Sequence, residues 1–118
     1  MVGAVPDAAR EVAPVDVYTL RYNWTLANGI EFDWDDWNTK PLAAHEVTPA
    51  EFEQVLNNDP LDMDYDLIDN EERYRSVGLT SGGRLLSVVF TVRHGRLRAV
   101  TAFPASVPDT KAFLERAK

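Results

Sequence analysis

Cysteine is absent from this sequence of 118 residues, and so is any long apolar run. Without cysteine the chain can form neither a disulfide framework nor a thiolate metal site. Its most apolar stretches, such as residues 85–92, have the length of a strand and fall far short of the roughly 20 residues of a membrane-spanning helix. No signal-peptide pattern opens the chain. We therefore expect one cytoplasmic domain with no membrane association.

Basic residues are scarce in the middle of the chain, and acidic residues are scarce at its end. Residues 31–72 carry fourteen carboxylates and one lysine, whereas residues 73–118 carry nine basic residues and two acidic ones. The formal net charge of −7 therefore conceals a basic C-terminal part. Two interpretations are open: the acidic part pairs with the basic part within the fold, or the basic part presents a free face to a polyanion such as RNA.

We expect the chain to divide into an N-terminal extension, residues 1–29, and a domain over residues 30–118. Residues 17–24 alternate between apolar and polar side chains, which predicts an added edge strand within the extension. The dipeptide Asn28-Gly29 favours a tight turn and predicts a hairpin between that strand and residues 30–34.

Two short helices and a C-terminal helix are predicted from capping signals and helical spacing. The first helix covers about residues 36–45, with Trp37 and Leu42 on its buried side and His45 as a further candidate for that side. The second begins at the capping box Thr48-Pro49-Ala50-Glu51. The third covers residues 111–118.

Three aspartates before the first helix resemble a set of metal ligands. Asp33, Asp35 and Asp36 lack the glycine and the distal glutamate of a calcium-binding loop. Carboxylates at this place also favour the start of a helix, because they interact well with its N-terminal dipole. We interpret them as a solvated acidic edge and expect neither a metal nor another cofactor.

The segment from Glu71 to Ala105 predicts the centre of the fold. Three runs rich in β-branched and aromatic residues, 71–79, 84–92 and 97–105, are separated by turns that contain glycine. They predict a three-stranded antiparallel meander, and residues 61–70 alternate in a way that suits a further short strand. Together with the helices this gives an α+β class: a small antiparallel sheet with two short helices on one face and a C-terminal helix.

The second turn of the meander determines which residues face each other. His94-Gly95 has the form of a two-residue type I′ turn, so Arg93 is expected opposite Arg96 and Thr91 opposite Arg98. Because side chains alternate between the two faces of a strand, one face becomes the core side. The residues expected there are Leu86, Val88, Phe90, Val92, Leu97 and Phe103.

The first turn allows a loop of two, three or four residues. A loop of two or four would put Arg73 and Arg75 on the core face, where unpaired guanidinium groups are costly. A three-residue loop, Ser81–Gly83, avoids this and sets Tyr74 against Phe90. It also aligns Arg73, Thr91 and Arg98 across three strands of the other face, with roughly 10 Å between the two arginines. A phosphate group fits between guanidinium groups at that separation.

The ordered set of motifs over about residues 30–105 resembles the BrnT family, the toxins of bacterial toxin–antitoxin pairs. The motifs that carry the resemblance are Glu31-Phe32-Asp33-Trp34-Asp35, Asn38, His45, Val47, Asp59-Pro60, Glu71-Glu72-Arg73-Tyr74, Gly78, Gly83-Arg84-Leu85-Leu86, Val88-Val89-Phe90-Thr91, Leu97-Arg98 and Ala102. The resemblance implies a RelE-like sheet, metal-independent cleavage of mRNA that halts translation, and a cognate BrnA-like antitoxin. A homodimer or a 2:2 complex with the antitoxin is compatible with it.

The resemblance also implies roles for individual residues. Cleavage of RNA without a metal needs cations on the developing phosphorane charge and groups that transfer protons. Arg73, Arg84 and Arg98 would be the charge stabilisers, with His45 or Glu72 as the proton-transfer groups. Further contacts to RNA are expected from the same arginine-lined face, through Arg75, Thr91, Arg93 and Arg96.

Two departures from the family pattern bear on activity. The family usually shows Lys-His-Gly-Val where this chain has Ala44-His45-Glu46-Val47, and it usually ends its last strand with Ala-Arg-Lys where this chain has Ala102-Phe103-Pro104. Removing one charge donor from a transition state typically costs about 3 kcal/mol, a hundredfold or more in rate. Two hypotheses are therefore open: an endoribonuclease that works with the remaining arginines, and a catalytically degenerate relative that binds RNA or protein without cleavage.

Overall fold

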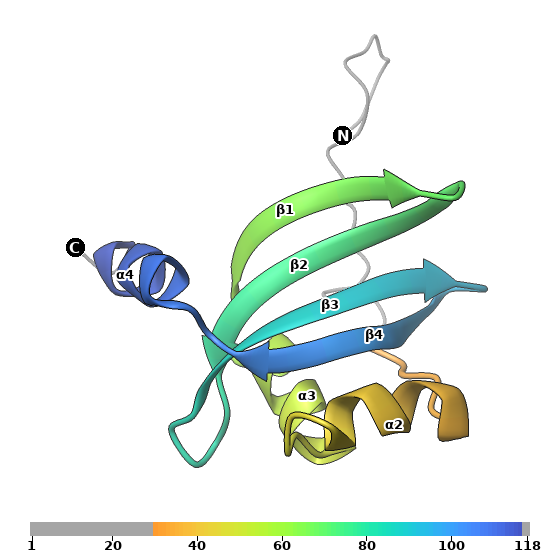
Figure 1. Ribbon diagram of the computed structural model, residues 1–118, viewed down its shortest axis with the longest axis horizontal. Coiled ribbons are helices and arrows are strands. Elements are labelled where there is room, and N and C mark those ends of the chain that lie inside the picture. The colour runs from red at the N-terminus through yellow and green to blue at the C-terminus, as the bar shows by residue number, and fades with distance from the viewer. Residues whose placement is uncertain (1–29, 117–118) are drawn as a thin grey trace, which may run out of the picture.

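A four-stranded antiparallel sheet with strand order β1-β2-β3-β4 organises the protein, as seen in a computed structural model that describes residues 30–116. Helices α2 and α3 lie on one face of the sheet, and α4 lies beyond the end of β4 (Figure 1). The elements in chain order are α2 (Asp36–Ala43), α3 (Pro49–Asn57), β1 (Leu61–Ile68), β2 (Glu71–Leu79), β3 (Leu85–Arg93), β4 (Arg96–Pro104) and α4 (Val107–Glu115). The predicted α+β class and the predicted meander are confirmed.

The fourth strand of the described sheet is β1, which follows the two helices in the chain. It pairs with β2, so the acidic segment before the meander extends the sheet by one strand. Residues 30–34 do not form the expected strand. They run beside β4 and make a single parallel bridge between Phe32 and Leu97 before the chain turns into α2. The predicted strand over residues 17–24 and the Asn28-Gly29 turn lie outside the described residues.

Helix α2 begins at the expected place but buries a different residue. Asp35 caps it, and the side chain of Asn38 completes the capping box. The amide of Asn38 donates to the carbonyl oxygen of Asp33 at 2.6 Å, so this residue points inward with Leu42, one helical turn further on. The prediction that Trp37 is buried is wrong: its neighbour takes the inward position, and the indole is 83% exposed.

The other two helices also begin at capping residues. Thr48 caps α3 and forms the predicted capping box with Glu51. Helix α4 starts at Val107, four residues earlier than expected, because the hydroxyl of Ser106 accepts a hydrogen bond from the backbone N–H of Asp109 at 3.2 Å. A serine that satisfies one of the free N–H groups of the first turn is a common helix start.

The register of the meander agrees with the sequence-based prediction at both turns. Tyr74 pairs with Phe90, as the three-residue loop Ser81–Gly83 requires. In the second hairpin Arg93 pairs with Arg96. Both turn residues there, His94 and Gly95, have positive φ angles of 52° and 75°, which is the conformation of a type I′ turn.

A β-bulge in β4 changes the faces of the last residues of the sheet. Val89 pairs with Thr101 and Phe90 pairs with Ala99, which leaves Val100 without a counterpart in β3. One extra residue exchanges the two faces of all that follows it in the strand.

Two residues expected on the core side have other surroundings, Phe103 because of the bulge and Val92 because of its place in β3. Ala102 is fully buried, whereas Phe103 pairs with Ser87 and is only half-buried. Val92 is 48% exposed, because it lies toward the hairpin tip and beyond the core. The core that α2, α3 and the sheet share consists of Leu42, Val47, Phe52, Val55, Leu56, Tyr74, Leu86, Val88, Phe90, Leu97, Ala99 and Ala102.

Close packing of α3 on β2 requires a glycine at position 78. A Cβ atom there would lie 3.1 Å from Val55 Cγ1 and 3.3 Å from Pro60 Cα. We expect Gly78→Ala to lower the free energy of unfolding by about 1–3 kcal/mol, because Val55 of α3 and the backbone at Pro60 must both move away from the new methyl group on β2. Urea denaturation measures this. Gly82→Ala is the matched control: the nearest atom to its Cβ, Thr80 Oγ1, is 3.9 Å away, so a similar loss in both variants would contradict the packing argument.

Candidate nucleic-acid interface

A row of polar side chains crosses the sheet face that lies opposite to α2 and α3. The pairings Tyr74 with Phe90 and Thr91 with Arg98 put Arg73, Thr91 and Arg98 at neighbouring positions on β2, β3 and β4. Since Tyr74 and Phe90 belong to the core, the residues next to them face the other way. The three residues share one face of the sheet, as predicted, and we call them the arginine row.

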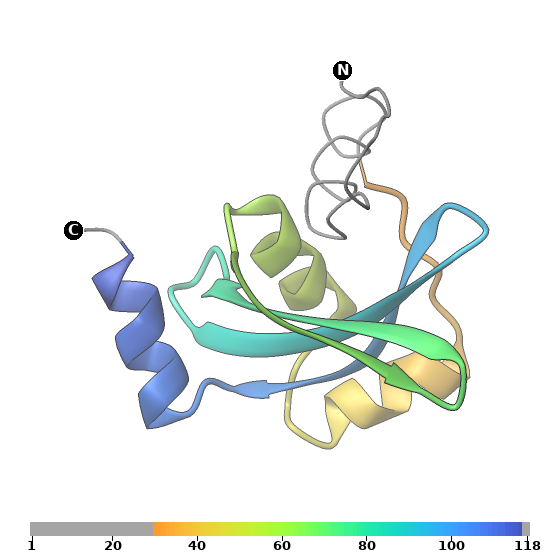
Figure 2. The same ribbon diagram turned by 90° about the horizontal axis from the view of Figure 1, so that it is seen from above.

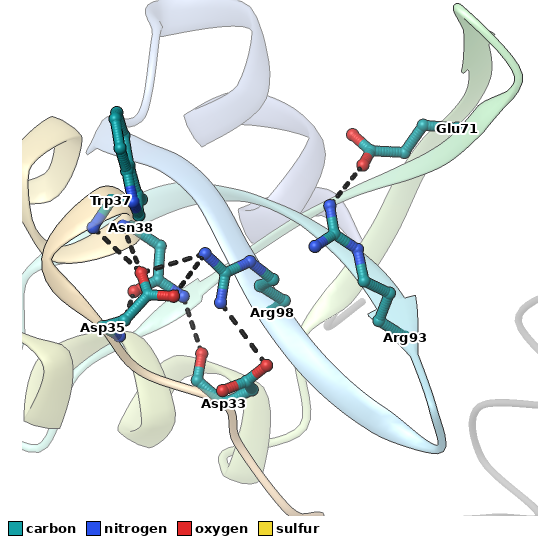
Figure 3. A network of polar contacts seen from close by, with 7 residues as sticks. All are labelled: Asp33, Asp35, Trp37, Asn38, Glu71, Arg93 and Arg98. Atoms are coloured by element: carbon teal, nitrogen blue, oxygen red, sulfur yellow. Dashed lines mark hydrogen bonds and ion pairs between the residues drawn. The ribbon is translucent and has the colours of Figure 1, made fainter.

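Arg98 is held by two carboxylates of the segment that leads into α2. Its Nη1 atom lies 3.4 Å from Asp33 Oδ2, and its Nη2 atom lies 2.7 Å from Asp35 Oδ2 (Figure 3). The side chain of Arg98 is only 13% exposed. Desolvation raises the pKa of Asp35, but hydrogen bonds from Arg98 and from the backbone N–H groups of Asn38 and Trp37 outweigh it, so the pKa is below its usual value.

Arg73 and Arg93 share a single carboxylate, that of Glu71. Arg73 Nε lies 3.0 Å from Glu71 Oε2, and Arg93 Nη2 lies 3.1 Å from Glu71 Oε1. The hydrogen bond from Arg93, together with that from Arg73, lowers the pKa of Glu71 against the opposing effect of desolvation. Sequence reasoning did not select Glu71, although strand alternation places it on the same face as Arg73.

Arg75 lies under the C-terminal helix. Its Nη1 atom is 2.6 Å from Asp109 Oδ2 of α4, and its Nε atom is 2.7 Å from Asp64 Oδ2 of β1. The same guanidinium donates to the hydroxyl of Ser87 at 3.0 Å. Desolvation would lower the pKa of Arg75, but the two carboxylates, Asp109 first, raise it. Arg75 thus connects three strands and a helix, while Arg96, at the hairpin tip, lies 3.8 Å from Glu31.

Two of the predicted catalytic residues lie at the other end of the sheet. Arg84, in the loop between β2 and β3, donates to Glu51 Oε2 at 2.9 Å and to the carbonyl oxygen of Glu46 at 2.9 Å. His45 is exposed, and its ring centroid lies 6.0 Å from that of Phe103, near the end of β4. Five strand positions separate Phe103 from Arg98, a distance of roughly 15 Å. The structure therefore does not bring His45 and Arg84 together with the arginine row.

Glu72 points away from the arginine row. Its carboxylate accepts hydrogen bonds from Tyr74 Oη at 2.9 Å and from Tyr65 Oη at 3.4 Å. Tyr74 belongs to the core, so Glu72 lies on the helix-bearing face. Desolvation first, and the charge of Glu72 second, raise the pKa of Tyr65.

The arginines of the described residues are paired with carboxylates of the same chain. Each of the seven arginines in residues 30–116 lies within ion-pair distance of a carboxylate. Most of these carboxylates come from the acidic part of the chain, so the first of the two interpretations of the charge pattern accords with the structure. The described portion contains no group of three histidine, aspartate or glutamate side chains arranged to hold a metal ion.

The described residues define a small α+β protein in which the sheet face opposite to α2 and α3 carries arginines, each held by a carboxylate. Residues 34–107, more than half of the chain, match the family of the ribonuclease toxin BrnT of type II toxin–antitoxin systems. The chain belongs to the BrnT family, which confirms the resemblance seen in its motifs. No curated protein matches the chain. At the level of the family it is a ribonuclease toxin, for which an antitoxin is a plausible partner. None of the helices in residues 30–116 is long and apolar enough to cross a membrane.

Proposed function

We propose that this protein is an endoribonuclease toxin that cleaves mRNA without a metal ion and is neutralised by a BrnA-like antitoxin. The observation that carries the proposal is the arginine row on the sheet face opposite to α2 and α3. Arg73 and Arg98 lie two strands apart, roughly 10 Å, with the hydroxyl of Thr91 between them. Membership of the BrnT family supplies the reaction class.

The chemistry that this face supplies is stabilisation of charge. When the 2′-oxygen of RNA attacks the adjacent phosphorus, the bond between phosphorus and the 5′-oxygen breaks, and negative charge develops on the phosphoryl oxygens. Water takes the proton of the 2′-hydroxyl and gives a proton to the departing 5′-oxygen. Guanidinium groups on both sides of the phosphate would stabilise that charge through paired hydrogen bonds. His45 and Glu72 lie away from the row, so we assign proton transfer to neither. General acid–base groups contribute typically 10²–10⁴-fold, and a site without them is slower by that factor.

The direct test is incubation of the purified full chain with a single-stranded RNA in the presence of EDTA. The expected products carry 2′,3′-cyclic phosphate ends, because the 2′-hydroxyl is the nucleophile. Cleavage that EDTA abolishes would contradict the metal-free mechanism. An RNA that stays intact with and without EDTA, together with unimpaired growth on induced expression, would contradict the ribonuclease function of this chain.

A second function is a binding module that holds RNA or a protein partner without cutting RNA. It is favoured by the carboxylates that hold Arg73 and Arg98, by the distance of His45 from the row, and by Ala102-Phe103-Pro104 at the end of β4. If the full chain binds the single-stranded RNA of the cleavage test but leaves it intact, this second function is supported over the first.

A further inference from the structure

Glu71 holds arginines from two strands at the hairpin end of the sheet. Its two carboxylate oxygens have separate partners: Oε2 lies 3.0 Å from Arg73 Nε on β2, and Oε1 lies 3.1 Å from Arg93 Nη2 on β3. Arginines hold a phosphate group in the same arrangement, with two guanidinium groups around two oxygens of one anion. Glu71 thus stands where an oxyanion from outside the chain could bind.

Solvent reaches this cluster more readily than it reaches Arg98 or Arg75 on the same face. The side chains of Arg93, Arg73 and Glu71 are 55%, 33% and 28% exposed. By contrast Arg98 is 13% exposed and Arg75 is 22% exposed. An incoming phosphate can therefore reach Arg73 and Arg93 without any change in the fold. Figure 3 shows Arg93 and Glu71 projecting beside β3, apart from the carboxylates that hold Arg98.

Glu71 is better suited to exchange than the two aspartates around Arg98. Asp35 caps α2, so its displacement from Arg98 is coupled to the start of a helix. Among residues 30–116 the carboxylate of Glu71 contacts Arg73 and Arg93, and it caps no helix there. Like other carboxylates it is ionised at neutral pH, where it competes with other anions for both arginines.

We propose that Arg73 and Arg93 form a phosphate-binding site for RNA, and that Glu71 occupies this site until an RNA phosphate displaces it. This inference rests on the proposed function and adds one specific step to it. Glu71 is an internal competitor of the RNA rather than a catalytic residue. It lowers the affinity of the free protein for polyanions and leaves both arginines available to a phosphate that can hold two guanidinium groups at once.

The test compares Glu71→Gln with the unaltered full chain in RNA binding. The probe is a fluorescent single-stranded RNA with 2′-O-methyl riboses, which cannot be cleaved, titrated at several salt concentrations. We expect Glu71→Gln to bind about fivefold tighter at low salt, because removal of an exposed competing carboxylate frees both cations. The dependence of log K on log salt becomes steeper by up to about one unit, because more cations contact phosphates.

Three further variants control the experiment. Asp59→Asn removes one negative charge at the opposite end of β1, at a position with φ of 49° that asparagine tolerates, and reports the effect of net charge alone. Arg93→Ala in the Glu71→Gln background should abolish the gain. Glu71→Ala tests the same site without the hydrogen-bonding amide, and thermal melting of each variant verifies the fold.

Each outcome decides the inference. Tighter binding by Glu71→Gln or Glu71→Ala, but not by Asp59→Asn, supports it, including the case in which the unaltered chain binds no RNA. If the unaltered chain binds RNA and both Glu71 variants bind it equally or more weakly, the inference is overturned and the proposed function is unaffected. Absence of RNA binding in every variant overturns both. An equal gain for a polyglutamate peptide overturns the assignment to RNA phosphate and points to an acidic protein segment as the ligand.

Discussion

Substitution of both Arg73 and Arg98 by alanine is expected to abolish growth arrest on induced expression and to slow RNA cleavage by at least a hundredfold. The two guanidinium groups are the cations of the arginine row, and the register of the meander places them on one face. Loss of one donor to transition-state charge typically costs 10²–10³-fold in rate. Single-turnover cleavage of a labelled RNA measures the chemical step, and growth curves measure toxicity.

The matched control removes two cations elsewhere. Lys111→Ala with Arg116→Ala takes the same charge from α4 and its C-cap, and Arg116 pairs with Asp59 rather than with a residue of the row. We expect this variant to remain toxic. Because Arg98 also holds Asp33 and Asp35, thermal melting must show that the Arg73→Ala/Arg98→Ala chain is folded. A folded double variant that cleaves RNA at the original rate would exclude the arginine row as the site.

The largest effect on stability is expected from Phe52→Ala. Phe52 is fully buried on α3, where its ring meets that of Trp34 edge to face at 5.6 Å between centroids. Truncation of a buried phenylalanine typically costs about 3–5 kcal/mol, because apolar contacts are lost and a cavity remains. Domains of this kind have about 5–15 kcal/mol of total stability, so the variant should lose at least about a fifth of it. Urea denaturation followed by tryptophan fluorescence measures the loss.

Trp37→Ala is the control for this variant, since it removes a larger aromatic side chain from the surface. The indole of Trp37 is 83% exposed, and substitutions at such sites usually change stability by no more than about 0.5 kcal/mol. A Trp37→Ala loss as large as that of Phe52→Ala would show that the indole packs against something outside the described residues.

Local patterns in the sequence were sufficient for much of the fold. The capping box at Thr48 located α3, and the His94-Gly95 turn determined the register of β3 and β4. The register of β2 and β3 followed from the cost of placing Arg73 and Arg75 in the core. These features depend on residues close together in the chain, because a turn type or a cap is decided within a few residues. The arginine row followed from the register alone.

Other features escaped prediction because they depend on contacts between distant segments. The bulge at Val100 has no signature in its own neighbourhood, and it moved Phe103 out of the core. Trp37 and Asn38 are adjacent, and only a hydrogen bond to the carbonyl oxygen of Asp33 decided which of them points inward. His45 and Arg84 were grouped with the arginine row by resemblance, whereas the direction of the strands places them at the other end of the sheet.

The sequence by itself determined that this protein has an antiparallel meander with two arginines side by side on one face, because strand alternation and turn geometry leave one register that keeps guanidinium groups out of the core. The tertiary structure alone decided the state of those arginines. Asp33 and Asp35 reach Arg98 only once the segment before α2 lies along β4. Glu71 is two residues from Arg73 in the same strand, but it binds Arg93 as well only once the β2–β3 hairpin has closed. Opposite charges far apart in the chain pair according to where the fold puts them, which composition does not reveal.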